Sequence, residues 1–407
     1  ITCKIFMKTL LLHSTYTEQI SYFDDWIDAF KAHSDFSTLC LNVFNASKDL
    51  ISDIKSKIEN YELIVLHHSM NGDTLKYLDP FIEALKNRRG KLVSFVGNEV
   101  NLPVIGMAPK IKNLQEIEAD FIATQLLEEA GQWLYEDCNK AKVISLPHAL
   151  NPEAFFSKHA FKDRKIDIGT RSARYGIYVG DNDRNSIIQY FYYNAYSLNL
   201  SIDLGLDSNS QKRFNRKEWS NFLSACKATL STEAGSFYLE KDDIIVNKIQ
   251  DFLKKRSLKI VLPHETFARK TYRKIVPHFI RKTIVSLLKD RLVEIDNIDQ
   301  ECDFHELYEK FFRLATKAPV YTKAISSRHF DAIGTKTLHI MYPGRYNDIL
   351  IPGEHYFELK PDHSNVEDLK ELLLDEKNVK NITEAAYNHV ITHHTHKNRL
   401  DALLKVL

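Results

Sequence analysis

Short apolar runs alternate with amphipathic runs over the first 150 residues, and this alternation limits the folds open to the chain. The apolar runs are rich in Val, Ile, Leu and Phe, as buried strands are. They lie at 6–12, 39–43, 63–67, 92–96, 121–124 and 143–146. Helical periodicity separates them, for example at 49–58 and 75–85. The pattern predicts βαβ units and a mainly parallel sheet, which binds ligands at the carboxyl ends of its strands.

A proline-containing link interrupts this alternation. Pro147 and Pro152 discourage helix continuation, and a charged run at 162–165 follows them. A new strand-like run begins at Ile166. Further helices are predicted at 184–193, 217–225, 244–254 and 283–293. A chain of 407 residues is long enough for two domains. We predict two Rossmann-like domains, at 1–155 and 156–390, and a terminal helix at 391–407.

Composition excludes several classes of protein. A net charge of +1 gives no reason to expect nucleic acid as a partner. The cysteine number is odd and no C-x-x-C pair occurs, which disfavours a disulfide framework and a structural zinc site and suits a reducing cytoplasm. The cysteines are Cys3, Cys40, Cys138, Cys226 and Cys302. Because no apolar run is long enough to cross a bilayer and the start lacks signal-peptide features, we predict a cytoplasmic protein.

The C-terminal part of the chain carries a family resemblance. Residues 326–335 read Ser-Ser-Arg-His-Phe-Asp-Ala-Ile-Gly-Thr, followed by a strand-like run at 338–341 and a loop at 342–348. This order resembles the donor-binding half of GT-B glycosyltransferases, in the group 1 class that includes the CgeB-type spore-maturation proteins. In that class a short helix reading roughly R-x-F-E-A-I-G-T lies beneath the nucleotide sugar. Weaker similarity occurs at 124–152, 165–169 and 231–236.

The resemblance implies a GT-B fold and a reaction. Two Rossmann-like domains would face each other across a cleft, with the C-terminal helices packing back on the first domain. A sugar would pass from a nucleotide-sugar donor to a glycan or lipid-linked glycan acceptor in cell-surface polysaccharide synthesis. No metal and no cofactor would be needed. The alternative is a catalytically silent GT-B module that binds a glycan or a protein partner.

Three arginines follow the opening strand of the second domain and could bind the donor diphosphate. Arg171, Arg174 and Arg184 surround a turn that contains Gly180. Without a metal, arginines and helix N-termini counter the charge of a diphosphate. Ordinary surface arginines in a solvated turn are the alternative. Asp181-x-Asp183 formally matches the D-x-D metal motif of GT-A enzymes, but turn and helix capping explain it equally, so no metal site is predicted.

Retaining GT-B enzymes often show two acids eight positions apart, and this chain keeps only the second. Asp331 matches that acid, whereas Lys323 occupies the first position. Asp331 is therefore predicted as a catalytic or sugar-binding residue, and Lys323 and Arg328 as phosphate ligands. The alternative is an exposed ion pair between Arg328 and Asp331, three residues apart on one helix. The missing first acid keeps the silent-module hypothesis open.

Other predicted site residues lie at strand ends. Glu233 follows the strand 228–230, and Tyr346 and Asn347 lie in the loop after the next strand, where they could flank the donor. In the first domain, His68 and Glu99 end two successive strands and are the predicted acceptor bases of an inverting reaction. A structural role is the alternative for each.

Two further groups of residues have competing interpretations. The C-terminal histidines could bind a metal, but helices that pack against the domains are favoured; they are His389, His393, His394 and His396. The basic runs 269–274 and 281–282 could approach an anionic polysaccharide, a lipid-phosphate acceptor or the inner face of the membrane. A solvated helix face is the default for these runs.

Overall fold

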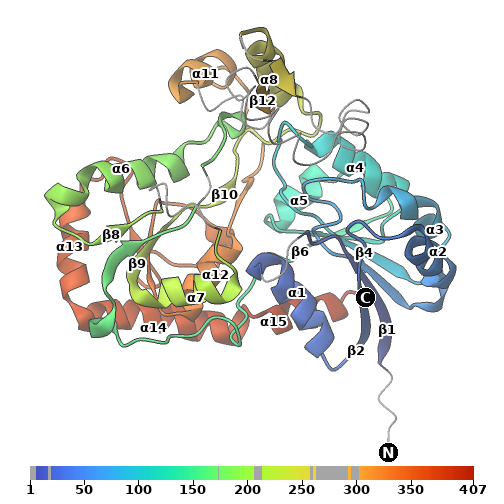
Figure 1. Cartoon of the computed structure of the whole chain (residues 1–407), viewed down its shortest axis with the longest axis horizontal. Coiled ribbons are helices and arrows are strands. Elements are labelled where there is room, and N and C mark those ends of the chain that lie inside the picture. The colour runs from blue at the N-terminus through green and yellow to red at the C-terminus, as the bar shows by residue number, and fades with distance from the viewer. Residues whose placement is uncertain are drawn as a thin grey trace, which may run out of the picture.

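A computed structural model describes most of the chain. The described residues are 6–16, 20–172, 174–205, 213–256, 260–262, 292–294 and 302–407. They form two α/β domains that lie side by side (Figure 1). The predicted basic runs 269–274 and 281–282 lie outside the described residues, as does most of the predicted helix 283–293. Its last two residues belong to a strand, β12 (Leu292–Glu294), which pairs with β11 (Ile260–Leu262).

The first domain contains a six-stranded parallel sheet in the order β2-β1-β3-β4-β5-β6. The strands are β1 (Met7–His13), β2 (Phe36–Asn42), β3 (Leu63–Leu66), β4 (Lys91–Phe95), β5 (Phe121–Thr124) and β6 (Lys142–Ser145). The helices are α1 (Ser21–Ala32), α2 (Lys48–Lys57), α3 (Ile82–Lys86), α4 (Met107–Glu116) and α5 (Glu128–Leu134). All four residues of β3 are buried, because helices cover both faces of the sheet. The six predicted strands are confirmed within a few residues.

The predicted helix at 75–85 is wrong in its first half. A 3₁₀ turn at Asp79–Phe81 precedes α3, and Pro80 lies inside that turn. Proline lacks the backbone N–H that a helix interior needs, so the α-helix begins only after it. Other 3₁₀ turns are Ile58–Asn60, Phe161–Asp163, Ile177–Val179 and Tyr346–Asp348.

The second domain has a five-stranded parallel sheet in the order β15-β14-β9-β7-β8. The strands are β7 (Ile166–Gly169), β8 (Ile202–Asp203), β9 (Cys226–Ser231), β14 (Leu338–Met341) and β15 (Phe357–Glu358), beside a small antiparallel pair, β10 (Ala234–Gly235) and β13 (Lys323–Ala324). The helices are α6 (Asp183–Leu198), α7 (Arg216–Ala225), α8 (Ile244–Arg256), α11 (Phe304–Phe311), α12 (Ser327–Gly334), α13 (Val366–Leu374) and α14 (Glu376–His393).

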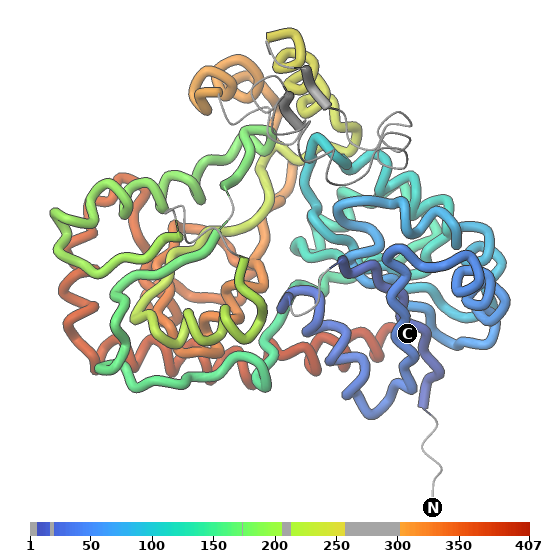
Figure 2. The backbone as a smooth tube through the Cα atoms, in the orientation of Figure 1, coloured from blue at the N-terminus to red at the C-terminus, as the bar shows by residue number. Residues whose placement is uncertain are grey.

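The C-terminal end returns to the first domain, which completes the GT-B architecture. Helix α14 packs on the second domain through Ala386 and Val390. Helix α15 (His396–Leu404) places Leu400 and Leu403 in the core of the first domain, beside Trp26. Figure 2 shows this red end of the chain running from one domain to the other. The predicted return of the C-terminal helices is confirmed.

Asp243 links the segment before α8 to the first domain by capping α4. Its carboxylate accepts hydrogen bonds from the backbone N–H groups of Met107 (2.8 Å) and Ala108 (2.9 Å) and from the side chain of Asn101 (2.5 Å). The negative charge also meets the positive end of the helix dipole. A Cβ atom on Gly106 would lie 2.1 Å from this carboxylate, so a larger residue there would displace the cap.

We expect Asp243→Ala to lower the free energy of unfolding by about 2–3 kcal/mol, measured by urea denaturation. The cap is lost, and alanine must also adopt the left-handed backbone of this residue, with φ of 61°. Asp242→Ala is the matched control, because Asp242 is exposed. Equal stability of the two variants would contradict the capping role.

Candidate active site

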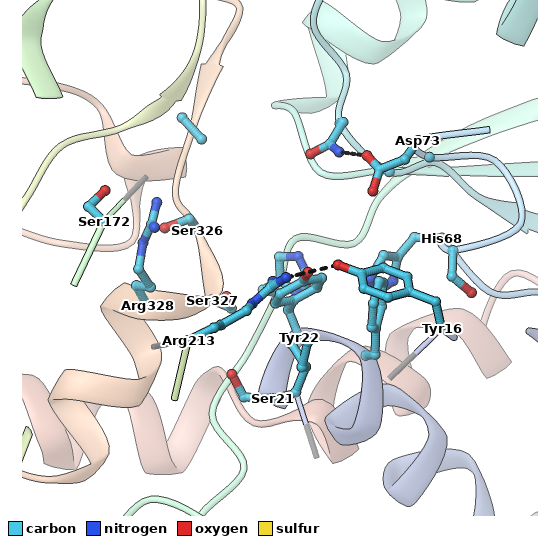
Figure 3. A pocket seen from close by; sticks show the side chains of 18 of the residues that line it. Tyr16, Ser21, Tyr22, His68, Asp73, Ser172, Arg213, Ser326, Ser327 and Arg328 are labelled. Atoms are coloured by element: carbon cyan, nitrogen blue, oxygen red, sulfur yellow. Dashed lines mark hydrogen bonds between the residues drawn. The ribbon is translucent and has the colours of Figure 1, made fainter. Parts of the chain in front are cut away.

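A cavity of about 1170 Å³ lies between the two domains (Figure 3). Its wall in the first domain includes Ser14, Ser69 and Asn98, which follow β1, β3 and β4. The opposite wall includes Ser172 and Gly205, which follow β7 and β8. The carboxyl ends of both sheets therefore open into one space. Parallel α/β sheets bind ligands at these ends, and the volume suits a ligand as large as a nucleotide sugar.

Two arginines at helix starts give the second-domain wall its positive charge. Arg184 is the second residue of α6 and Arg328 the second residue of α12, and both line the cavity. Within the part of the chain that the structure describes, no carboxylate pairs with either guanidinium. Arg184 is 8% exposed and lies over the ring of Tyr175, 3.6 Å from its centroid. Burial, and then the charge of Arg184, lower the pKa of Arg328 to about 10, so Arg328 is a cation at neutral pH.

The start of α12 adds backbone donors to this wall. Ser326, Ser327 and Arg328 all line the cavity, so the positive end of the helix dipole faces it. Ser326 caps the helix, with its hydroxyl 3.0 Å from Nδ1 of His329. Figure 3 shows Arg328 and the two serines on the same side of the cavity.

Asp331 lies one turn further along α12 and also lines the cavity. Its Oδ2 accepts hydrogen bonds from Nε1 of Trp219 (2.9 Å) and from the hydroxyl of Ser21 (3.3 Å), which belongs to the first domain. Burial, and then the nearby carboxylate of Asp25, hold the pKa of Asp331 well above its ordinary value. Because Asp331 is only 2% exposed, it does not form the exposed ion pair with Arg328 that was the alternative interpretation.

Lys323 does not line the cavity. Its ammonium group lies 2.8 Å from Oδ2 of Asp181 and 2.8 Å from Oδ2 of Asp183. Burial lowers the pKa of Lys323, but these two carboxylates outweigh burial and raise the pKa above its ordinary value. The Asp-x-Asp pair thus holds an ammonium group, and no cluster of metal ligands occurs among the described residues. The carboxylate of Asp181 accepts a hydrogen bond from the backbone N–H of Asp183 (3.1 Å), as the turn interpretation expects, whereas Asp183 is the first residue of α6 and does not cap it.

The other two loop arginines differ from Arg184. Arg171 lines the cavity, but both ends of its guanidinium bond to the carboxylate of Asp203 at 2.8 Å, and it lies over the ring of Phe222. Arg174 is exposed and does not line the cavity. Of these three predicted phosphate ligands, only Arg184 presents to the cavity a guanidinium with no carboxylate partner in the described part of the chain.

Three predicted donor ligands lie outside the lining of the cavity and hold loops of its wall in place. They are Glu233, Tyr346 and Asn347. The carboxylate of Glu233 is 3% exposed and accepts hydrogen bonds from the backbone N–H of Tyr346 (2.7 Å) and the hydroxyl of Tyr321. Asn347 accepts from the backbone of Ile325 (2.7 Å) and donates to Gln125 O in the first domain (2.9 Å). Tyr346 and Asn347 have positive φ, a strained conformation that these contacts hold in place. None of the three lines the cavity, contrary to the predicted donor contacts.

His68 and Glu99, the two predicted bases, have different environments. His68 lines the cavity and stacks on Phe23, with 5.4 Å between ring centroids. Neither ring nitrogen has a hydrogen-bond partner among the described residues. Burial holds the pKa of His68 well below 6.5, so its imidazole is neutral at neutral pH. Glu99 does not line the cavity; it accepts hydrogen bonds from Thr124 and Tyr135, both at 2.6 Å.

Sequence reasoning missed an arginine that joins the domains across the cavity. Arg213, from the second domain, donates to the hydroxyl groups of Tyr16 (2.8 Å) and Tyr22 (2.5 Å) in the first (Figure 3). Arg216 likewise donates to Asp25 (2.8 Å). No linear motif contains these partners, because the residues of each pair lie nearly 200 positions apart.

Two of the C-terminal histidines, His389 and His396, pack against other rings, whereas His393 is exposed. His389 stacks on His355 with 4.8 Å between centroids, and His396 meets the ring edge of Trp26.

No helix in the described ranges is both long and apolar enough to span a membrane.

One comparison with known proteins gives a match, and it lies in the C-terminal part of the chain. A family model described as "Glycosyl transferase-like" matches residues 303–405. This segment includes α12 and the loop after β14. A search of curated protein sequences finds no match. The narrower resemblance to CgeB-type proteins stays a prediction.

Two of the solved structures that are similar to this chain have low sequence identity to it. HepE from Anabaena, in complex with UDP-glucose, is 10% identical with a TM-score of 0.49; the match covers 98% of this chain and 100% of that one. Sucrose-phosphate synthase from Thermosynechococcus elongatus is 11% identical with a TM-score of 0.47, and the match covers 98% of each chain.

Proposed function

We propose that the protein is a glycosyltransferase that moves a sugar from a nucleotide-sugar donor to a glycan or lipid-linked glycan acceptor without a metal. The main support is the meeting of Arg184, Arg328 and the start of α12 at one cavity wall, with no carboxylate paired to either guanidinium in the described chain. A diphosphate is the ligand that best matches two such cations and a helix N-terminus. The family-model match to residues 303–405 agrees with this assignment.

The proposed reaction assigns a role to each wall. The bond between the anomeric carbon and the diphosphate oxygen breaks, and that carbon bonds to an acceptor hydroxyl oxygen. Arg184, Arg328 and the helix start stabilise the charge that develops on the departing diphosphate. The neutral imidazole of His68 takes the hydroxyl proton from the acceptor side. Asp331 lies one turn from Arg328 and would contact hydroxyl groups of the donor sugar.

We further propose a cytoplasmic location and a role in cell-surface polysaccharide synthesis, both from the sequence resemblance and the scattered cysteines. Contact with the inner face of a membrane belongs to the same proposal.

The test is thermal stabilisation by UDP, GDP, dTDP, ADP and CMP, each with Mg²⁺ and with EDTA. We expect one nucleoside diphosphate to raise the melting temperature equally in both conditions. A shift that disappears in EDTA would contradict the metal-independent part of the proposal. The absence of any shift would contradict the donor site itself.

One observation favours a second candidate, a catalytically silent binding module. Lys323 replaces the first acid of the retaining pair, and Asp181 and Asp183 hold it away from the cavity. A silent module would bind the nucleotide without turnover. The release of free nucleotide from a matching nucleotide sugar therefore separates the two: continuous release supports the enzyme, and binding without release supports the module.

A further inference from the structure

The first-domain wall of the cavity carries a continuous strip of aromatic rings. The strip consists of Tyr22, Phe23, Tyr16, Phe44 and Tyr77, and all five side chains line the cavity. Successive ring centroids are 4.3 Å apart for Tyr22–Phe23, 5.9 Å for Phe23–Tyr16, 6.4 Å for Tyr16–Phe44 and 5.1 Å for Phe44–Tyr77. The inner end of the strip lies at His68, because Phe23 stacks on that imidazole.

The charge on this wall is opposite to that on the donor wall. Among the described residues that line the cavity, Asp73 is the only charged one from the first domain, whereas the second domain contributes five arginines and Asp331. Lys76 has its ammonium 5.2 Å from the centroid of Tyr77 but does not line the cavity. Arg213 crosses from the second domain, and Tyr16 and Tyr22 accept its hydrogen bonds. At the outer end, Phe44 and Tyr77 therefore have beside them no described cation that lines the cavity and could bind an anionic group.

We infer that this strip binds an uncharged saccharide as the acceptor; the inference rests on the proposed function. The apolar face of a sugar ring can pack on aromatic rings, which bury large areas at low entropic cost. The carboxylate of Asp73 accepts hydrogen bonds from hydroxyl groups and repels phosphates and carboxylates, and Asn98, which is hydrogen-bonded to it, lines the cavity beside it. A saccharide on the strip would reach His68 with the hydroxyl group that accepts the donor sugar.

The experiment uses an array of oligosaccharides that are neutral, phosphorylated or rich in uronic acid, with the whole protein in the presence of its stabilising nucleotide. We expect binding to neutral members and at least roughly tenfold weaker binding to anionic ones. Phe44→Ala and Tyr77→Ala should each weaken neutral binding by about tenfold and leave the nucleotide-induced shift unchanged. Tyr193→Ala is the matched control, since Tyr193 lies on α6 and is 77% exposed.

Several outcomes would overturn the inference and leave the proposed function standing. Preferential binding of anionic members would do so. Binding of a nucleotide but of no saccharide would also overturn it. A loss of nucleotide binding in Phe44→Ala would overturn it too, because the strip would then bind the nucleobase. Conversely, if no nucleotide binds, the proposed function fails, while neutral binding that is lost in Phe44→Ala still supports the strip as a saccharide site.

Discussion

Arg328→Ala should weaken binding of the nucleoside diphosphate by roughly a hundredfold. A charge-assisted hydrogen bond contributes about 1.5–3 kcal/mol, and a guanidinium can make two of them to a diphosphate. The free protein should keep its melting temperature, because Arg328 pairs with no carboxylate in the described chain and its charge is close enough to that of Arg184 for the two to repel. Isothermal titration calorimetry measures the affinity, and thermal denaturation without ligand measures the stability.

Arg174→Ala is the matched control for this prediction, because Arg174 lies in the second domain, after β7, but is exposed and outside the cavity. Arg328→Lys should recover part of the affinity, since it keeps the charge and loses the forked geometry of the guanidinium. Equal affinities for Arg328→Ala and Arg174→Ala would place the diphosphate elsewhere in the molecule.

Acidification from pH 7.5 to pH 5 should destabilise the protein strongly. Burial lowers the pKa of ten described histidines, so the unfolded chain binds protons that the folded chain rejects. They are His13, His67, His68, His148, His329, His339, His355, His363, His394 and His396. Each can lower the free energy of unfolding by up to about 1.4 kcal/mol per pH unit as pH falls below 6.5.

Carboxyl groups whose pKa is raised by burial stabilise the folded chain as pH falls, since the folded chain binds their protons at a higher pH than the unfolded chain does. They are fewer, namely Asp25, Glu99, Asp181, Glu233, Glu240 and Asp331. A net uptake of only two protons on unfolding would cost roughly 3 kcal/mol per pH unit, out of a typical total of about 5–15 kcal/mol. The melting temperature should therefore fall steadily below pH 6.5.

Thermal denaturation across this pH range, with His68→Gln as the variant, checks the prediction. His68→Gln removes one buried histidine, so its melting temperature should fall less steeply with acid. His159→Gln, at an exposed position, is the matched control and should follow the parent protein at every pH. A melting temperature that stays constant down to pH 5 would show that the histidines become charged inside the folded protein.

Local pattern was sufficient for most of the fold. Two strands have the predicted bounds, because each is a short apolar run between polar residues. They are β14 (Leu338–Met341) and β5 (Phe121–Thr124). The failure at 75–85 also has a local cause, Pro80, which the amphipathic periodicity concealed.

The site depended on pairings that local pattern does not contain. Arg171, Arg174 and Arg184 look alike as a sequence, yet Asp203 neutralises the first, the second is exposed outside the cavity, and only the third faces the cavity with no carboxylate partner among the described residues. Lys323 was predicted to meet phosphate, but carboxylates 140 positions away bind it first. Whether a charged side chain is available to a ligand depends on partners that the fold brings to it.

The sequence by itself determined the two parallel α/β domains, a short helix around Arg328 and the presence of Arg184 and Arg328, since these follow from hydrophobic periodicity, the family resemblance and residue type. Only the tertiary structure decided which cations stay unpaired, which carboxylates are buried and which aromatic rings form a strip. Those properties arise from contacts between residues far apart in the chain, such as Ser21 with Asp331 and Arg213 with Tyr16, and packing of the two domains creates them.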